Sequence, residues 1–163
     1  MARTRRPEPR SERPKMPGYG LPEETGGLLP WKWAETRLKR SHNYWVVTVR
    51  KNGAPHAMPV WGVWVDRKFY FSTGKLSVKA QNLRANAACI VCTENAAEAV
   101  IVEGEARIVR SLALLRKVGK PYAAKYKPWK LDPALGPVFA VRPKAVFAMW
   151  EKQFADKATR WRF

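Results

Sequence analysis

From residue 44 onward, the sequence alternates short β-prone runs with turn residues, and this spacing constrains the fold more than any other feature. The runs are rich in Val, Ile, Tyr, Phe and Trp, and the first pair is joined by the hairpin signal Asn52–Gly53. Six or seven such strands with two or three short helices predict a mainly β fold built on an antiparallel barrel. The predicted strands are 44–49, 56–65, 69–73, 88–93, 99–109, 138–141 and 145–150.

Two serines mark where the pattern changes to a helical period. Ser77 and Ser111 are each suited to cap a helix that follows. Asn86 is expected to end the first helix in the left-handed conformation. Prolines, beginning with Pro121, are expected to break the segment after Ser111 into a lysine-rich connection.

The charge balance is strongly basic, at +18 with a pI near 10.4. Residues 1–25 are rich in Pro, Arg, Glu and Gly without apolar periodicity, which predicts a flexible basic N-terminal arm ahead of one folded domain, 26–163. No apolar run is long enough for a membrane span, and no apolar stretch follows the first arginines as in a secretory signal, so a soluble cytoplasmic protein is expected. Basic surfaces attract polyanions, and the charge alone identifies no partner.

The cysteine pair Cys89 and Cys92 has C-x-x-C spacing. On a strand these side chains point to opposite faces, and His42 and His56 lack ligand spacing, so we expect no metal site.

The junction 70–79 brings hydroxyls and lysines to the start of a helix. Ser72, Thr73, Ser77 and Lys79 surround Gly74 there, and helix N-termini favour anions. The pattern therefore favours a phosphate site, although a capped helix with solvated lysines has the same pattern.

Two further segments have features of binding sites. The strand around Trp61 and Trp64 is apolar on both faces, as in strands that line a site for a flat ring, although the tryptophans also suit a core or a dimer interface. Near the C-terminus, Arg160 and Arg162 alternate with aromatic residues, so both guanidiniums share one face and suit a carboxylate or phosphate; the alternative is a solvated basic tail.

The sequence contains no hydrolase or nucleotide-binding signature such as G-x-S-x-G, H-E-x-x-H, the P-loop or G-x-G-x-x-G. It also has only two histidines, and no catalytic residue can be assigned. We therefore expect a bound cofactor to carry the chemistry.

Together these segments resemble the pyridoxamine 5′-phosphate oxidase-like FMN-binding split-barrel superfamily, and within it the flavin- and deazaflavin (F420)-dependent oxidoreductases. The resemblance rests on Asn52-Gly53-x-Pro55-His56, Pro59-Val60-Trp61-Gly62-Val63-Trp64, Ser72-Thr73-Gly74-x-x-Ser77-x-Lys79, Asn82-Leu83 and Thr159-Arg160-Trp161-Arg162-Phe163.

The resemblance implies a six-stranded antiparallel split β-barrel that forms a homodimer, with the cofactor between the subunits. It implies that Ser72, Thr73, Ser77 and Lys79 hold the cofactor phosphate, that Met58, Pro59, Val60 and Trp61 flank the ring system, and that Asn82 supports the helix start. It further implies that Trp150 reaches the cofactor of the other subunit and that Arg160 and Arg162 contact the substrate.

The sequence departs from true pyridoxamine phosphate oxidases at three places. The resemblance places Met58 and Val63 at positions where those enzymes have a basic residue and a lysine for the flavin phosphate. It places Arg162 where they have a histidine. We therefore expect a substrate other than a B6 vitamer. The basic body suits the polyanionic tail of F420 somewhat better than FMN.

The sequence is compatible with three functions. The first is an F420- or FMN-dependent oxidoreductase acting on a small organic substrate. The second is a split barrel that binds a cofactor or haem without turnover, which the shortage of acid–base residues also fits. The third, specific nucleic-acid binding, is not expected, because no recognition motif accompanies the charge.

Overall fold

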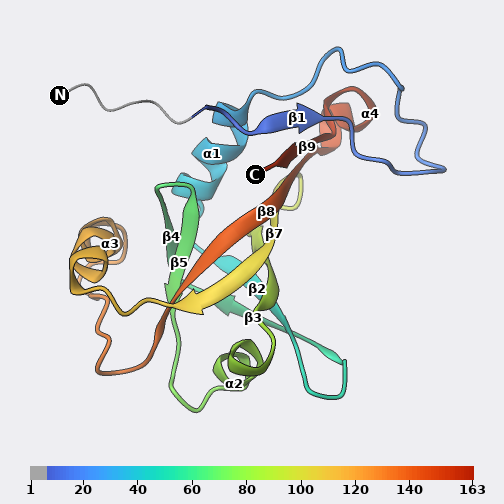
Figure 1. The fold of residues 1–163 in the computed structure, drawn as a ribbon. Helices are drawn as coiled ribbons and strands as arrows, with labels where there is room; N and C mark the ends of the chain where they lie inside the picture. The colour runs from blue at the N-terminus through green and yellow to red at the C-terminus, as the bar shows by residue number, and fades with distance from the viewer. Residues whose placement is uncertain (1–6) are drawn as a thin grey trace.

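A computed structural model describes residues 7–163, and in this range the chain is mainly β with short helices (Figure 1). The strands are β1 (Arg10–Glu12), β2 (Tyr44–Val49), β3 (Pro55–Val60), β4 (Gly62–Val65), β5 (Lys68–Ser72), β6 (Ala88–Thr93), β7 (Glu98–Ile108), β8 (Val138–Trp150) and β9 (Thr159–Arg162). The helices are α1 (Trp31–Arg40), α2 (Val78–Ala85), α3 (Leu112–Lys125) and α4 (Phe154–Lys157), with a 3₁₀ turn over Glu151–Gln153.

The strands form one antiparallel sheet that curls without closing. The main order is β1-β9-β8-β7-β6-β2-β3, and β5 pairs with both β4 and β8. The long strand β8 changes neighbours along its length: its beginning pairs with β5 and its later part with β9. This open arrangement confirms the predicted split barrel, with the short strands β1 and β9 added at one side.

The predicted strand 56–65 is divided in two at Trp61. β3 pairs with β2, whereas β4 turns away to pair with β5. Gly62 allows β4 to lie this close, because a Cβ atom there would be 2.2 Å from the Phe69 ring and 2.7 Å from the Tyr70 carbonyl oxygen. The division gives the barrel its split.

The predicted strands 138–141 and 145–150 are instead one strand, β8. The ladder between β7 and β8 shifts register after Glu103, where Gly104 lies opposite Pro143. A Cβ atom on Gly104 would be 2.2 Å from the Arg142 carbonyl oxygen, so only glycine fits the closely packed backbones. The bulge accommodates the proline that the sequence pattern treats as a break.

Two clusters of buried side chains hold these elements together. The larger lies inside the curled sheet, where Val46, Val91, Val102 and Val146 follow one another across neighbouring strands and Leu38 of α1 covers them. The smaller cluster packs Val118, Tyr122 and Tyr126 of the α3 region against Val63 and Tyr70 outside β4 and β5.

The helices follow the predicted caps but not the predicted ends. Ser77 and Ser111 cap α2 and α3 through hydrogen bonds from Ala80 N and Leu114 N. Asn86 is extended, with φ −141°, because the chain enters β6 directly. α3 does not end at Pro121 as predicted but continues to Lys125. An interior proline costs a helix about 3 kcal/mol, and the burial of the apolar face of α3 offsets this cost.

The predicted arm, 1–25, is attached to the body over part of its length; residues 1–6 lie outside the described residues. β1 pairs with β9, and the Arg13 guanidinium donates to the carbonyl oxygens of Gly26 (2.8 Å) and Asp156 (2.7 Å). The boundary at residue 25 stays a prediction. No helix in the described part of the chain has both the length and the apolar character needed to cross a bilayer.

Candidate functional site

The turn between β5 and α2 brings together the hydroxyls that the sequence singles out. Thr73 Oγ1 and Ser77 Oγ share a hydrogen bond of 3.0 Å, and Ser77 Oγ accepts from Ala80 N at 3.2 Å. Gln81 N donates to Ser77 O, so the N–H groups of Val78 and Lys79 are left without acceptors within the helix. We call this turn with the first residues of α2, 72–79, the cradle.

A second segment braces the cradle from behind. Thr73 N donates to Pro137 O at 3.3 Å, and Ser72 Oγ donates to the same oxygen at 3.4 Å. Gly136 lies against Thr73 so closely that a Cβ atom would be 2.1 Å from the Thr73 carbonyl oxygen. Sequence reasoning missed this support, because residues 136–137 read as an ordinary loop.

Lys79 supplies a positive charge at the start of α2. Its side chain is half-buried, and burial lowers the pKa of its ammonium group. The first turn of α2 contains no acidic residue. A partly desolvated cation beside free backbone N–H groups is the arrangement that favours an anion.

Asn82 fastens α2 to the sheet. It is buried, and its Nδ2 donates to Thr48 Oγ1 at 2.9 Å, while Thr48 Oγ1 donates to His56 O at 3.4 Å. The Asn82 side chain thus links α2 to strand β2. Thr48 went unnoticed in the sequence, although a hydroxyl at an inward position of a strand is a signal for such a tether.

β3 lies beside the cradle end of the sheet and presents part of its surface to solvent (Figure 1). Met58 is 44% exposed, Pro59 is exposed, and Val60 is buried in the core against Tyr44. β3 is also the last strand in the sheet order among the described residues, which leaves one edge of its backbone unpaired. A ring placed here would meet Met58, Pro59 and strand backbone, but not the side chain of Val60.

Trp61 belongs to an aromatic group that links β3 to the end of α3. Its ring stacks on Tyr126 with centroids 4.8 Å apart and planes at 9°, and His42 packs edge-on against both. Beside them, Lys125 Nζ donates to Tyr44 Oη at 2.7 Å and to Gly62 O at 3.2 Å. Desolvation lowers the pKa of Lys125 to about 8. The sequence places this lysine only within a lysine-rich connection.

Trp150 lies at the far end of β8 from the cradle. Val138, which pairs with Ser72, begins a strand of 13 residues that ends at Trp150. At roughly 3.3 Å per residue the two ends are about 40 Å apart. One chain therefore does not bring Trp150 to its own cradle.

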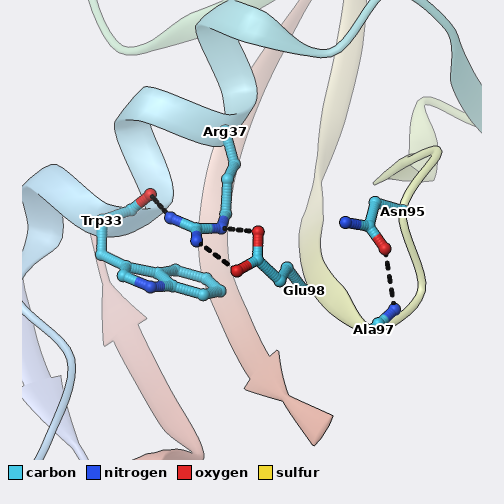
Figure 2. Close-up of polar contacts among 5 residues, drawn as sticks. All are labelled: Trp33, Arg37, Asn95, Ala97 and Glu98. Atoms are coloured by element: carbon cyan, nitrogen blue, oxygen red, sulfur yellow. Dashed lines mark hydrogen bonds and ion pairs between the residues drawn. The ribbon is translucent and has the colours of Figure 1, made fainter. Parts of the chain in front are cut away.

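Figure 2 shows Arg37 of α1 with Trp33 and Glu98, and Glu98 is the ladder partner of Trp150. Glu98 pairs with Trp150 across the ladder and binds Arg37 of α1 through two contacts, 2.8 and 3.1 Å long. The Arg37 guanidinium lies 3.4 Å above the Trp33 ring, whose centroid is 6.4 Å from that of Trp150. This contact ties α1 to the strand end that carries Trp150.

Arg160 and Arg162 lie side by side on one face of β9, as their alternation predicts. Both contact the same carboxylate oxygen, Glu12 Oε1, through their Nε atoms at 2.6 and 2.8 Å. β9 pairs with the later part of β8, so this pair also lies away from the cradle of its own chain.

The cysteines stay separate from any site. Cys89 is buried, Cys92 is half-buried on the opposite face of β6, both are free, and burial raises the pKa of both thiols. Within residues 7–163, no three His, Cys, Asp or Glu side chains come together in a way that would hold a metal ion.

Comparison with known proteins places these features in a family. The family model for pyridoxamine 5′-phosphate oxidase matches residues 32–152. No curated protein matches the sequence.

Several solved structures resemble the chain. An F420 reductase is 25% identical, with a TM-score of 0.55 over 69% of this chain and 94% of that one. An FAD-binding protein from Mesorhizobium loti is 17% identical, with a TM-score of 0.56 over 81% and 94% of the chains. A heme binding protein from Mycobacterium smegmatis is 18% identical, with a TM-score of 0.60 over 74% of this chain and 55% of that one.

Proposed function

The chain belongs to the pyridoxamine 5′-phosphate oxidase family, and on that premise we propose that it is an oxidoreductase that transfers hydride between bound F420 or FMN and a small organic substrate. The observation that carries the proposal is the cradle. Two half-buried hydroxyls, a half-buried lysine and free helix N–H groups belong to the same few residues at the start of α2, beside the accessible strand β3.

These residues fit the phosphate of such a cofactor. Thr73, Ser77 and Lys79 offer donors to the phosphate oxygens, and the first turn of α2 holds no carboxylate that would repel them. When bound, the cofactor supplies the ring that gives or accepts the hydride. The protein's own residues bind the phosphate, orient the ring along Met58, Pro59 and Trp61, and exclude water from one side of it.

The proposed site is completed by a second subunit. Trp150 and the arginines of β9 lie too far from the cradle to act on the same cofactor within one chain. A row of partly exposed apolar side chains also crosses the outer face of the sheet, and it suits a symmetric partner. Its members are Pro59, Trp45, Cys92, Ile101 and Phe147.

We favour F420 over FMN as the bound cofactor. A hollow of about 450 Å³ lies at the other end of α2 from the cradle, and three arginines line it: Arg84, Arg107 and Arg110. Arg84 also donates to Lys75 O in the cradle turn at 2.9 Å, so the basic surface continues from the cradle into the hollow. This surface suits a cofactor with carboxylates beyond its phosphate.

A B6 vitamer is not the proposed substrate. Val63 is 4% exposed and packs under α3. The place at which oxidases of that substrate class have a lysine is therefore apolar and closed here, which agrees with the departures in the sequence.

The proposal is tested by adding FMN and F420 separately to the purified protein and following absorbance and binding stoichiometry. We expect one of them to bind at about one per subunit with a micromolar or lower dissociation constant. Reduced cofactor on the protein should then be reoxidised by an acceptor faster than free cofactor is. If neither cofactor binds at micromolar concentration, the proposal fails.

The second candidate is a split barrel that holds a cofactor or haem without turnover. One observation favours it: the described residues of the cradle provide hydroxyls and two lysines but no histidine or carboxylate for proton transfer. In stopped-flow mixing, reoxidation of the bound cofactor no faster than that of the free cofactor would support this candidate. A Soret band in the purified protein would identify haem as the ligand.

A further inference from the structure

The two arginines of β9 hold a carboxylate that belongs to the protein's own N-terminal segment. We propose that Arg160 and Arg162 form a binding site for the carboxylate of a substrate, and that Glu12 of β1 occupies this site until the substrate displaces it. The inference rests on the proposed function, in which a second subunit brings these arginines to the cofactor, and it names the chemical class of the substrate that they would contact.

The geometry of Glu12 is that of a bound ligand. Its Oε1 atom accepts a hydrogen bond from Arg162 Nε at 2.8 Å and forms an ion pair with Arg160, whose Nε lies 2.6 Å away without hydrogen-bond geometry. The Arg160 side chain is 19% exposed and lies over the Phe147 ring at 5.8 Å, which holds the guanidinium in place. A preformed pair of guanidiniums on an apolar support is a good receptor for a carboxylate.

The neighbouring surface adds positive charge and space. A hollow of about 360 Å³ opens beside Arg162, between the segment before β1, the turn joining β4 to β5, and β8. Arg10, Lys68 and Arg142 line it together with Arg162, against the acids Glu8 and Asp66. Because Asp66 forms an ion pair with Lys117, the cations dominate the field that an entering anion meets.

β1 is attached to β9 by a short ladder, so this segment can detach from β9 and bind to it again. The strand has only three residues, and its ladder runs from Arg10 opposite Arg162 to Glu12 opposite Arg160. The next residue is anchored much more firmly. Arg13 donates to the carbonyl oxygens of Glu24, Gly26, Asp156 and Ala158. Release of residues 7–12 would therefore leave the segment tethered at Arg13, close to the site.

The test uses benzoate as the probe, titrated into ¹⁵N-labelled protein while the amide shifts of β9 are followed. Glu12→Gln removes the competing charge and should strengthen benzoate binding about tenfold, since a hydrogen bond to a charged group contributes on that scale. A chain that begins at Arg13 should bind at least as tightly. Glu23→Gln, which makes the same charge change at an exposed position away from the hollow, is the matched control and should bind like the original chain.

Adding Arg160→Ala or Arg162→Ala to Glu12→Gln should abolish the gain. Equal benzoate affinity in Glu12→Gln and Glu23→Gln would overturn the proposal, as would a gain that survives loss of both arginines. Cofactor binding, measured on the same variants, separates the two hypotheses. Loss of cofactor binding in every variant, including the original chain, contradicts the proposed function, whereas cofactor binding without the benzoate response contradicts only this inference.

Discussion

Lys79 is the residue on which the proposed phosphate contact depends most. Lys79→Ala and Ser77→Ala should each weaken cofactor binding by about 1–3 kcal/mol, because each removes a donor to a charged group. Lys75→Ala is the matched control, since Lys75 lies in the same turn with an exposed side chain. Isothermal titration of each variant measures the change. Unchanged affinity in both site variants would place the phosphate elsewhere.

Lys125 gives a pH-dependent signature of its own. Burial lowers its pKa from 10.5 to about 8 in the folded state. Between these pH values the unfolded chain binds more protons than the folded chain, so this lysine makes stability rise with pH across the window. Below pH 8 it is charged in both states, and its unfavourable contribution is then fully present.

The measurement compares the original chain with Lys125→Met by chemical denaturation from pH 7 to 11. The free energy of unfolding of the original chain minus that of Lys125→Met should rise between about pH 8 and pH 10.5. Lys127→Met, at an exposed neighbour, is the matched control for the loss of one lysine. Parallel curves for the two variants would refute the assignment to Lys125.

At the scale of elements, two glycines should respond in opposite ways to the same substitution. Gly104→Ala places a methyl group 2.2 Å from the Arg142 carbonyl oxygen at the bulge between β7 and β8, and overpacking of this kind costs about 1–3 kcal/mol. Gly119→Ala lies within α3 with no atom within 4 Å of the new Cβ, so it should stabilise by about 1 kcal/mol. Thermal denaturation of the pair tests the register around Pro143, and a stabilising Gly104→Ala would contradict it.

At the scale of the whole molecule, the separation of the cradle from Trp150 makes a dimer necessary for the proposed site. Sedimentation should give twice the chain mass of 18.6 kDa. Ile101→Arg, in the middle of the row on the outer sheet face, should yield monomers with weakened cofactor binding. Leu135→Arg, at a position 79% exposed away from that row, should leave both unchanged. A monomeric protein that binds cofactor fully would exclude the shared site.

Local patterns determined much of this protein. The alternation of apolar residues and the turn at Asn52–Gly53 predicted most strands, and Ser77 and Ser111 predicted where α2 and α3 begin. Both kinds of prediction succeed because side-chain period and helix capping are local properties. The cradle hydroxyls were predicted for the same reason: Thr73 and Ser77 are four residues apart in one turn.

The tertiary structure alone decided what depends on contacts between distant segments. The division of β3 from β4 depends on how closely Gly62 approaches β5, and the continuity of β8 depends on Gly104 opposite Pro143. The pKa of Lys125 is lowered because folding buries its ammonium group beside Tyr44 and Gly62, which lie far away in sequence. Likewise, the alternation of Arg160 and Arg162 predicted a binding site for an anion. Only the tertiary structure shows that Glu12 contacts this site, because a contact between the two ends of the chain leaves no pattern in the local sequence.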